Sequence, residues 1–491
     1  MALKITPSAP RVVEPNRTAA PRPPVKASAP AAQTPSSRVR DTYYADKFEG
    51  APDVAAKPKG IFDSIIDAIK GLFGLNGTSA ATAPAQTSAP AAPVDQDKVE
   101  QAARMVNSAA DLVNILGGSG LNQAEKDALV AKLARDPNKQ MCLFGDVERM
   151  SPEDQAVIAK AIGAAVSSGA MTDKDLLALA DYDQSGMGPA RFAQLLALDP
   201  SNLQPGGAAE RLGQALWARS AGATGTAAEN DRAAAALIFT SSPELMARNL
   251  DTPQKREEAF TSLTNYLDQA STKVPGPLLD KFKQDAVAGL ANLFKAHGPE
   301  LMRGLTADGN PGGGVVLSKF FADVYLAPEG KAFAKDIEDT LRQTASGLMK
   351  DMNTSDESAR QLATRQLARI AASVNGGGVI VIDRYRKELA ANKDRVDQLA
   401  GLLGGAIGAL LPEVGVPTGA AVDALSKAIA EAILHDPDRP DVALGTMYAT
   451  FQQKLHDYEK TIGHGDLVSA FDGEYAAELA YIREQLELNY A

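Results

Sequence analysis

The stretch VEQAARMVNSAADLVNIL, residues 99–116, indicates the class of fold. Its apolar residues recur every three or four positions, as on one face of an α-helix, and the pattern stops at Gly117-Gly118. A capping-box pattern follows directly, with Asn122 as the cap and Glu125 three residues later. The sequence therefore predicts a run of helices that starts near residue 97.

Further helix starts recur along the chain. Ser151, Ser242 and Thr252 each precede a proline, which is an N-cap followed by proline at the first helical position, and Thr172 opens another helix. The best strand candidate is GGGVIVIDRY, residues 376–385, whose length suits the start of a buried helix equally well. The predicted fold class is all-α, with a multi-helix body of helical hairpins or bundles.

Composition agrees with this class. The chain has 491 residues, of which 45% are apolar and only 5% aromatic. Strands prefer β-branched and aromatic residues, so this balance favours packed helices. The single cysteine, Cys142, excludes an intramolecular disulfide and is expected in the core.

The N-terminal part differs from the rest. Residues 1–59, with runs such as APRPPVKASAPAAQTPSS, predict a disordered Pro/Ala/Ser-rich tail, and residues 76–96 predict a second disordered linker. Residues 1–60 contain ten Lys/Arg against five Asp/Glu and so carry a net charge of about +5. Because the whole chain carries −11, the remaining residues carry about −16. A basic tail on an acidic body indicates either an anionic partner or a solvated tail.

One amphipathic segment, GIFDSIIDAIKGLFGL at 60–75, lies between the tail and the linker. On a helix its apolar residues form one stripe, and the residues are Ile61, Phe62, Ile65, Ile66, Ile69, Leu72 and Phe73. A helix this short is marginal in water and needs a surface to fold upon. A groove on the protein's own body, a groove on a partner protein and a lipid interface remain open.

The helical body is predicted to divide into an N-terminal domain at 97–200, a middle region at 201–310 and a C-terminal domain at 311–491. The last contains an apolar hairpin at 399–434. Its uncharged stretch, residues 399–411, is too short to span a bilayer at 1.5 Å per residue. The hairpin is therefore either a buried core element or one that inserts into a membrane only after rearrangement.

Motifs for chemistry are weak. DYDQSG, residues 181–186, matches the first half of a calcium loop through Asp181, Asp183 and Ser185. Phe192 stands where the bidentate glutamate is needed, so the match is a weak one and no metal site is expected. The four histidines show no helix-face pair, and no cofactor is expected.

Catalytic and nucleotide motifs are missing from the sequence, which contains neither GxSxG nor a Walker loop. An enzyme of unrecognised type would reveal itself by a polar cavity with converging titratable groups and a shifted pKa. Sequence-specific nucleic-acid binding is not expected, because phosphate contacts need Lys and Arg while the body is acidic.

The chain start, MALKITPSAPRVVEP, contains no apolar core of a secretory signal, and no stretch reaches 18 apolar residues. The expected location is the cytoplasm, or the cell exterior by a route without a cleaved Sec signal.

Residues 235–434 resemble the helical regions of bacterial secreted and polymorphic-toxin-type proteins. The resemblance rests on four segments, which are the two PELM helices at 243–246 and 299–302, the GGGVVLSKFFADV turn-helix and the GLLGGAIGALLP hairpin. The leader is similar to Pro/Ala-rich tails of myxobacterial proteins. The resemblance implies a bacterial, export-linked stalk or carrier without catalytic activity.

The function expected from the sequence is that of a non-enzymatic helical interaction protein. It would dock on a protein partner or a membrane surface through residues 60–75. Two alternatives stay open, namely a pore-forming-like secreted effector that uses 60–75 and 399–434, and an unrecognised enzyme. The oligomeric state is left open.

Overall fold

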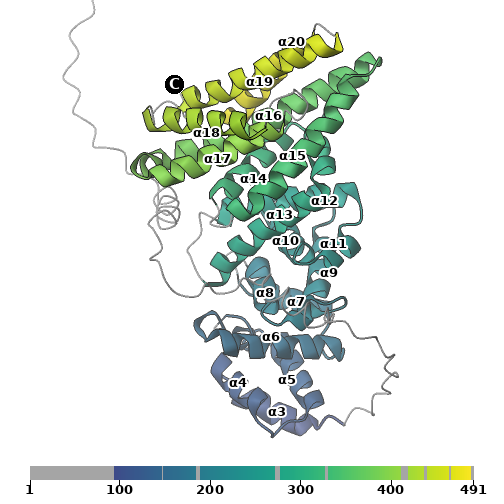
Figure 1. The fold of residues 1–491 in the computed structure, drawn as a ribbon. Coiled ribbons are helices and arrows are strands. Elements are labelled where there is room, and N and C mark those ends of the chain that lie inside the picture. Colours follow the sequence, from purple (N-terminus) through teal and green to yellow (C-terminus); the bar gives the residue numbers. More distant parts are fainter. Residues whose placement is uncertain are drawn as a thin grey trace, which may run out of the picture.

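The computed structural model describes residues 93–145, 147–183, 188–270, 277–326, 330–410, 418–435, 440–463 and 466–487. These residues form eighteen α-helices, α3 to α20, and no strand (Figure 1). The predicted all-α class is therefore confirmed. The tail 1–59, the segment 60–75 and all but the last residues of the linker 76–96 lie outside the described part of the chain.

The helices follow one another along an elongated molecule, from α3–α6 at one end to α16–α20 at the other (Figure 1). The first group comprises α3 (Gln96–Met105), α4 (Ala109–Gly117), α5 (Gln123–Arg135), α6 (Pro152–Ser167), α7 (Asp173–Ala180), α8 (Gly188–Leu196) and α9 (Ala208–Ser220). Three short 3-10 turns lie among them, at Gln140–Cys142, Val147–Arg149 and Pro200–Leu203.

The middle group comprises α10 (Thr226–Phe239), α11 (Pro243–Asn249), α12 (Pro253–Ala270), α13 (Pro277–Leu305), α14 (Gly313–Leu326) and α15 (Gly330–Met352). The last group comprises α16 (Glu357–Ala391), α17 (Lys393–Ala409), α18 (Thr418–His435), α19 (Pro440–Ile462) and α20 (Leu467–Gln485).

The predicted caps begin helices as expected. Side chains of Asn122, Ser151, Thr172 and Ser242 each accept a backbone hydrogen bond at the start of α5, α6, α7 and α11. The single helix predicted over 99–116 is wrong, because the chain breaks between α3 and α4. Ser108 accepts a hydrogen bond from Asp111 N at 3.2 Å and starts the second helix.

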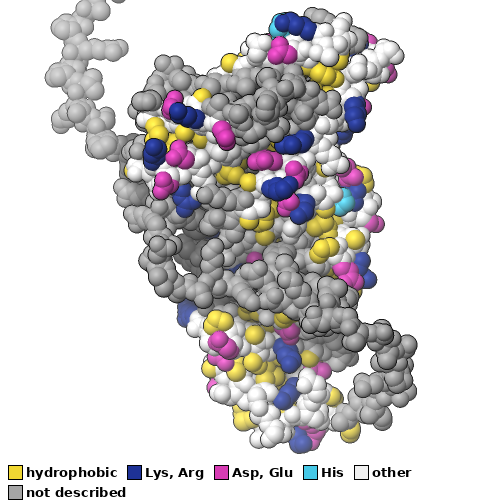
Figure 2. Space-filling model, viewed as in Figure 1, with side chains coloured by type: hydrophobic (Ala, Val, Ile, Leu, Met, Phe, Trp, Pro, Cys, Tyr) yellow, Lys and Arg dark blue, Asp and Glu magenta, His cyan; other side chains and the backbone are white. Residues whose placement is uncertain are grey.

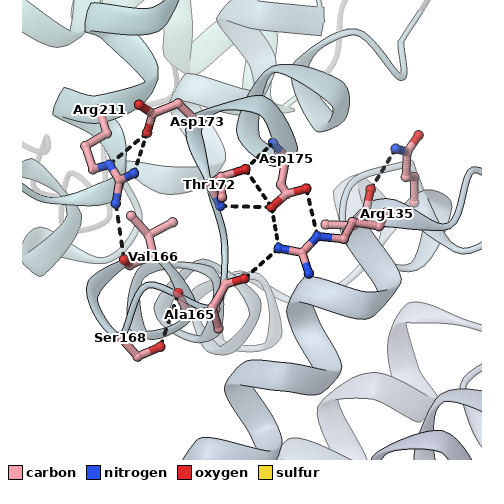
Figure 3. A network of polar contacts seen from close by, with 11 residues as sticks. Arg135, Ala165, Val166, Ser168, Thr172, Asp173, Asp175 and Arg211 are labelled. Carbon is pink, nitrogen blue, oxygen red and sulfur yellow. Dashed lines mark hydrogen bonds and ion pairs between the residues drawn. The ribbon is translucent and has the colours of Figure 1, made fainter.

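A network of charged side chains joins α5, α7 and α9 (Figure 3). Arg135 donates from Nε and Nη2 to the two carboxylate oxygens of Asp175, at 3.0 and 2.9 Å. Arg211 on α9 donates to Asp173 Oδ1 at 2.8 Å. Burial would raise the pKa of Asp175, but the hydrogen bonds from Arg135 and Thr172 outweigh it and lower that pKa.

The centre of the molecule is a cluster of aromatic side chains between α12, α13 and α14. The ring centroids of Phe260 and Phe320 lie 5.0 Å apart, those of Phe294 and Phe320 4.9 Å, and those of Phe320 and Phe321 5.4 Å. Aromatic pairs at such distances add to the stabilisation from burial. This cluster fixes the positions of α12 and α14 relative to each other.

The strand candidate at 376–385 is helix, since α16 runs through the glycine triplet 376–378 without interruption. A Cβ atom added at Gly377 would lie 2.7 Å from Phe321 Cβ on α14, and one at Gly378 would lie 2.8 Å from Leu403 Cδ2 on α17. The triplet therefore lets two helices approach α16 closely from different sides. Packing, rather than strand formation, explains these glycines.

The apolar hairpin 399–434 is part of the core. It consists of the end of α17 and most of α18, and Leu403, Ala406 and Ile407 are at most 1% exposed. Gly404 packs directly against Ser426 of α18. Within the described residues, no helix combines the length and the apolar character needed to cross a membrane.

The buried apolar side chains, Cys142 among them, form one cluster that extends from Val99 to Ile482. The core is thus continuous across the predicted boundaries at 200/201 and 310/311, and the division into three parts stays a prediction. On the face drawn in Figure 2, acidic and basic side chains are interspersed rather than segregated.

Candidate functional site

The described residues form a cleft of about 760 Å³, with a mixed polar and apolar lining, between α10, α12, the start of α14 and the end of α20. We call it the α12 cleft, because α12 contributes its longest wall. Its charged and polar lining comprises Glu229, Arg232, Gln254, Glu257, Glu258, Thr261, Ser262, Asn265, Asn310 and Gln485. Leu305, Val315, Val316 and Tyr481 supply apolar surface.

The sequence of α12 explains why this wall is polar. Phe260, Leu263 and Leu267 are separated by three and four residues and are buried on one face. Glu258, Thr261 and Asn265 repeat the same spacing two residues earlier and line the cleft. An amphipathic helix with this period presents one face to the core and the other outward. The apolar face of α12 meets the aromatic cluster, so its polar face is directed into the cleft.

Glu257 connects this wall to the loop between α13 and α14. Asn310 Nδ2 donates to Glu257 Oε1 at 2.7 Å. Burial raises the pKa of Glu257 and the neighbouring Glu258 raises it further, while the hydrogen bond from Asn310 acts in the opposite direction. Glu258 itself accepts a hydrogen bond from Gln254 at 2.9 Å. The carboxylates are thus held by amides, and neither forms an ion pair within the described chain.

Arg232 on α10 is the cation of the cleft. Its Nε is shielded from solvent and has no hydrogen-bond partner, and the side chain forms no ion pair with the residues that the structure describes. Other partly buried arginines are paired: Arg219 with Asp231 at 2.7 Å, Arg256 with Glu300 at 2.8 Å, and Arg369 with Glu474 at 2.6 Å. A shielded N–H donor without an acceptor is costly, so Arg232 differs from these arginines through its Nε atom.

The first turn of α14 is not an anion site. Gly313 packs on the backbone of Leu305, and Gly314 packs on the carboxylate of Glu478. These contacts leave no room for a side chain and explain the glycines by packing. Burial raises the pKa of Glu478, which lies with its carboxylate against the helix start where an anionic ligand group would have to bind.

The residues of the calcium-like loop serve as partners of arginines. Asp181 accepts from Arg219 at 2.7 Å, and Asp183 is paired with Arg191. Ser185 lies outside the described residues, and Phe192 is fully buried in α8. No group of three or more His, Cys, Asp or Glu side chains suited to a metal ion occurs in the described part of the chain.

The seven residues of the predicted apolar stripe, Ile61 to Phe73, also lie outside the described residues. The α12 cleft, in turn, was not predicted from the sequence. Its polar residues on α12 follow a helical spacing that a solvent-facing surface would share, and its other walls come from positions as distant as 229 and 485. Only the assembled helices reveal the cleft.

No family model matches the chain, and neither a curated protein nor a solved structure is significantly similar to it. The resemblance of residues 235–434 to helical regions of bacterial secreted proteins therefore stays a prediction.

Proposed function

We propose that the chain is a non-enzymatic helical interaction protein, of the bacterial kind that the resemblance implies, and that its body binds a segment of a protein partner in the α12 cleft. The observation that carries this proposal is the unpaired state of the charged groups in that cleft. Most partly buried charges elsewhere in the described chain have partners, whereas Arg232, Glu229 and Glu257 form no ion pair there. Groups in this state gain from a ligand that supplies the missing partners.

The shape of the cleft suits an extended segment. Its wall on α12 runs from Gln254 to Asn265, a distance of about 16 Å at 1.5 Å per residue. An extended peptide of about five residues has the same length. A volume of about 760 Å³ also lies within the range in which proteins bind ligands larger than a single amino acid.

Binding is favoured over catalysis for a geometric reason. The cleft does have two features expected of an active site, because it gathers titratable groups and the pKa of Glu257 is raised. However, neither Thr261 nor Ser262 forms a hydrogen bond to a glutamate of the described cleft, although a nucleophile needs such a base within reach. The arrangement supplies recognition groups without a nucleophile paired to a base.

Residues 60–75 are the second binding element in this proposal. The α12 cleft contains charged groups of both signs, which an apolar stripe would leave without partners. The described body exposes only Met105, Val157 and Leu362 among its large apolar side chains, and these lie on three different helices. An external surface, on a protein partner or a membrane, is therefore the favoured docking site for 60–75.

Selection from a displayed library of random heptapeptides on the immobilised full-length protein tests the role of the cleft. Thr261→Trp and Gln485→Trp place an indole ring in the cleft, and Lys255→Trp places one on α12 outside it. Wild type and Lys255→Trp should enrich peptides that the two blocked variants do not retain, provided circular dichroism shows unchanged helicity. Absence of enrichment, or equal enrichment on all four proteins, would overturn the proposal.

A further inference from the structure

We infer that the α12 cleft selects a peptide segment carrying one basic and one acidic side chain, the basic one toward Glu257 and Glu258 and the acidic one toward Arg232. This inference rests on the proposed function, and it specifies the chemistry of the partner. It follows from how charges of opposite sign are arranged in the cleft.

The cleft keeps opposite charges apart. Arg232 lies in the same cleft as Glu229, Glu257 and Glu258, and yet it forms no ion pair with any of them within 4.0 Å. Elsewhere in the described chain arginines do reach carboxylates across helices, as Arg219 reaches both Asp181 and Asp231 at 2.7 Å. Arg232 and the glutamates are therefore available to a ligand as separate subsites.

A ligand of a single sign does not satisfy this arrangement. An anion on Arg232 alone would face three glutamates in the same cleft, and repulsion between like charges would weaken it. A cation on the glutamates alone would leave the shielded Nε of Arg232 without an acceptor, which keeps its desolvation cost in place. A segment with both signs supplies an acceptor to Arg232 and a donor to the glutamates.

The neutral lining extends this match to a peptide backbone. Ser262 is only 8% exposed, lines the cleft, and its hydroxyl forms no hydrogen bond with the described residues. Asn265 accepts a hydrogen bond from Lys319 at 3.3 Å, so its amide group retains donors for a ligand. Backbone carbonyl and N–H groups of an extended peptide are suitable partners for these two side chains.

Defined peptides test the inference on the full-length protein. The probes are fluorescein-labelled, end-blocked Gly/Ser hexapeptides with one Lys and one Glu separated by one to three residues, in both orders. Each has a Lys-only and a Glu-only relative in which the other charge is replaced by Gln. Fluorescence anisotropy should show at least one Lys/Glu peptide binding about tenfold more tightly than both of its relatives, a difference of about 1.4 kcal/mol.

A double-mutant cycle assigns the acidic side chain to Arg232. Arg232→Gln should reduce the affinity for the best Lys/Glu peptide about tenfold and leave its Lys-only relative unchanged. Arg149→Gln, which removes an exposed arginine outside the cleft, should change neither. The double variant Glu257→Gln/Glu258→Gln should bind the best Lys/Glu peptide no more tightly than its Glu-only relative.

The outcomes separate the two proposals. If Lys-only peptides bind as tightly as Lys/Glu peptides and Thr261→Trp or Gln485→Trp abolishes both, the inference is wrong and the proposed function stands. If no probe binds to the cleft and the library yields no cleft-dependent peptide, both are wrong. Equal losses with Arg232→Gln and Arg149→Gln would also overturn the inference.

Discussion

Glu257 on α12 and Asn310 in the loop before α14 are joined by a hydrogen bond of 2.7 Å, donated by the asparagine amide. A Cβ atom added at Gly304 would lie 2.6 Å from the other carboxylate oxygen of Glu257, so this carboxylate packs closely on the last turn of α13. These contacts hold one carboxyl group partly buried between α12, the end of α13 and the loop before α14. Burial and the neighbouring Glu258 make its ionisation unfavourable and outweigh the hydrogen bond from Asn310.

The pH dependence of Glu257 is the first prediction. Its pKa is raised in the folded protein, so ionisation costs stability as pH rises through the unfolded and then the folded pKa. Below the unfolded pKa the cost is absent, because both states are protonated. Glu257→Gln keeps an acceptor for Asn310 and removes this cost. Urea unfolding should show the variant more stable than wild type near pH 8, with the difference shrinking near pH 4.

A difference for Glu257→Gln that stays constant between these two pH values would contradict the account. It would show that the side-chain change itself, rather than loss of ionisation, alters stability.

The glycine triplet of α16 gives the second prediction. Gly377→Ala adds a methyl group 2.7 Å from Phe321 Cβ and 3.1 Å from Ser318 O, and overpacking of this kind costs about 1–3 kcal/mol. Gly401→Ala on α17 meets nothing within 4 Å and should gain about 0.5–1 kcal/mol from helix propensity. Thermal unfolding should therefore move in opposite directions for these two variants. Equal shifts would mean that α14 does not pack closely on α16.

The closed hairpin of α17 and α18 gives the third prediction. An ideal Cβ at Gly404 lies 3.3 Å from Ser426 Cβ, so a small shift of the two helices brings the pair to the separation of about 3.5–4.5 Å found in disulfides. Gly404→Cys with Ser426→Cys, in a Cys142→Ala background, should cross-link under mild oxidation without loss of helicity. The closed loop should add about 3 kcal/mol of stability.

The matched control for the hairpin is Gly401→Cys with Ser426→Cys, because a Cβ at Gly401 meets no atom within 4 Å. This pair should stay reduced. A reduced Gly404/Ser426 pair would show that the hairpin is open in solution. Dye release from anionic vesicles by wild type that the cross-link abolishes would instead support the membrane-perturbing alternative.

Residues 60–75 give the fourth prediction. Ile66→Asp places a carboxylate within the apolar stripe, whereas Ser64→Asp makes the same charge change beside it. Flotation of the full-length protein with anionic vesicles, together with circular dichroism, separates the effects on binding and on folding. Ile66→Asp should abolish flotation with unchanged helicity, and Ser64→Asp should retain it. Failure of wild type to float would direct the search to a protein partner.

Local signals allowed much of the fold to be predicted. Asn122, Thr172 and Ser242 begin helices because their side chains accept hydrogen bonds from nearby backbone N–H groups. Such contacts span three residues and are visible in the sequence. The PELM repeats show the limit of this approach, since 243–246 begins α11 whereas 299–302, with Pro299, lies inside the continuous helix α13.

The α12 cleft and the packing of the glycine triplet could not be predicted, because both depend on contacts that are not local in the sequence. Glycine at 376–378 signals conformational freedom when α16 is considered alone, and its packing role depends on Phe321 and Leu403. Likewise, Arg232 resembles any helical arginine in sequence, because its lack of a partner depends on where α12 and α20 lie. Both properties depend on contacts between residues distant in the chain.

Hydrogen–deuterium exchange of the full-length protein, with and without a peptide selected on it, tests whether the α12 cleft is the binding site. We predict slower exchange at saturating peptide in α12 near residues 254–265 and at the end of α20, with little change in α3 to α6. Protection confined to other helices, or no protection at saturation, would contradict the assignment of the α12 cleft as the binding site.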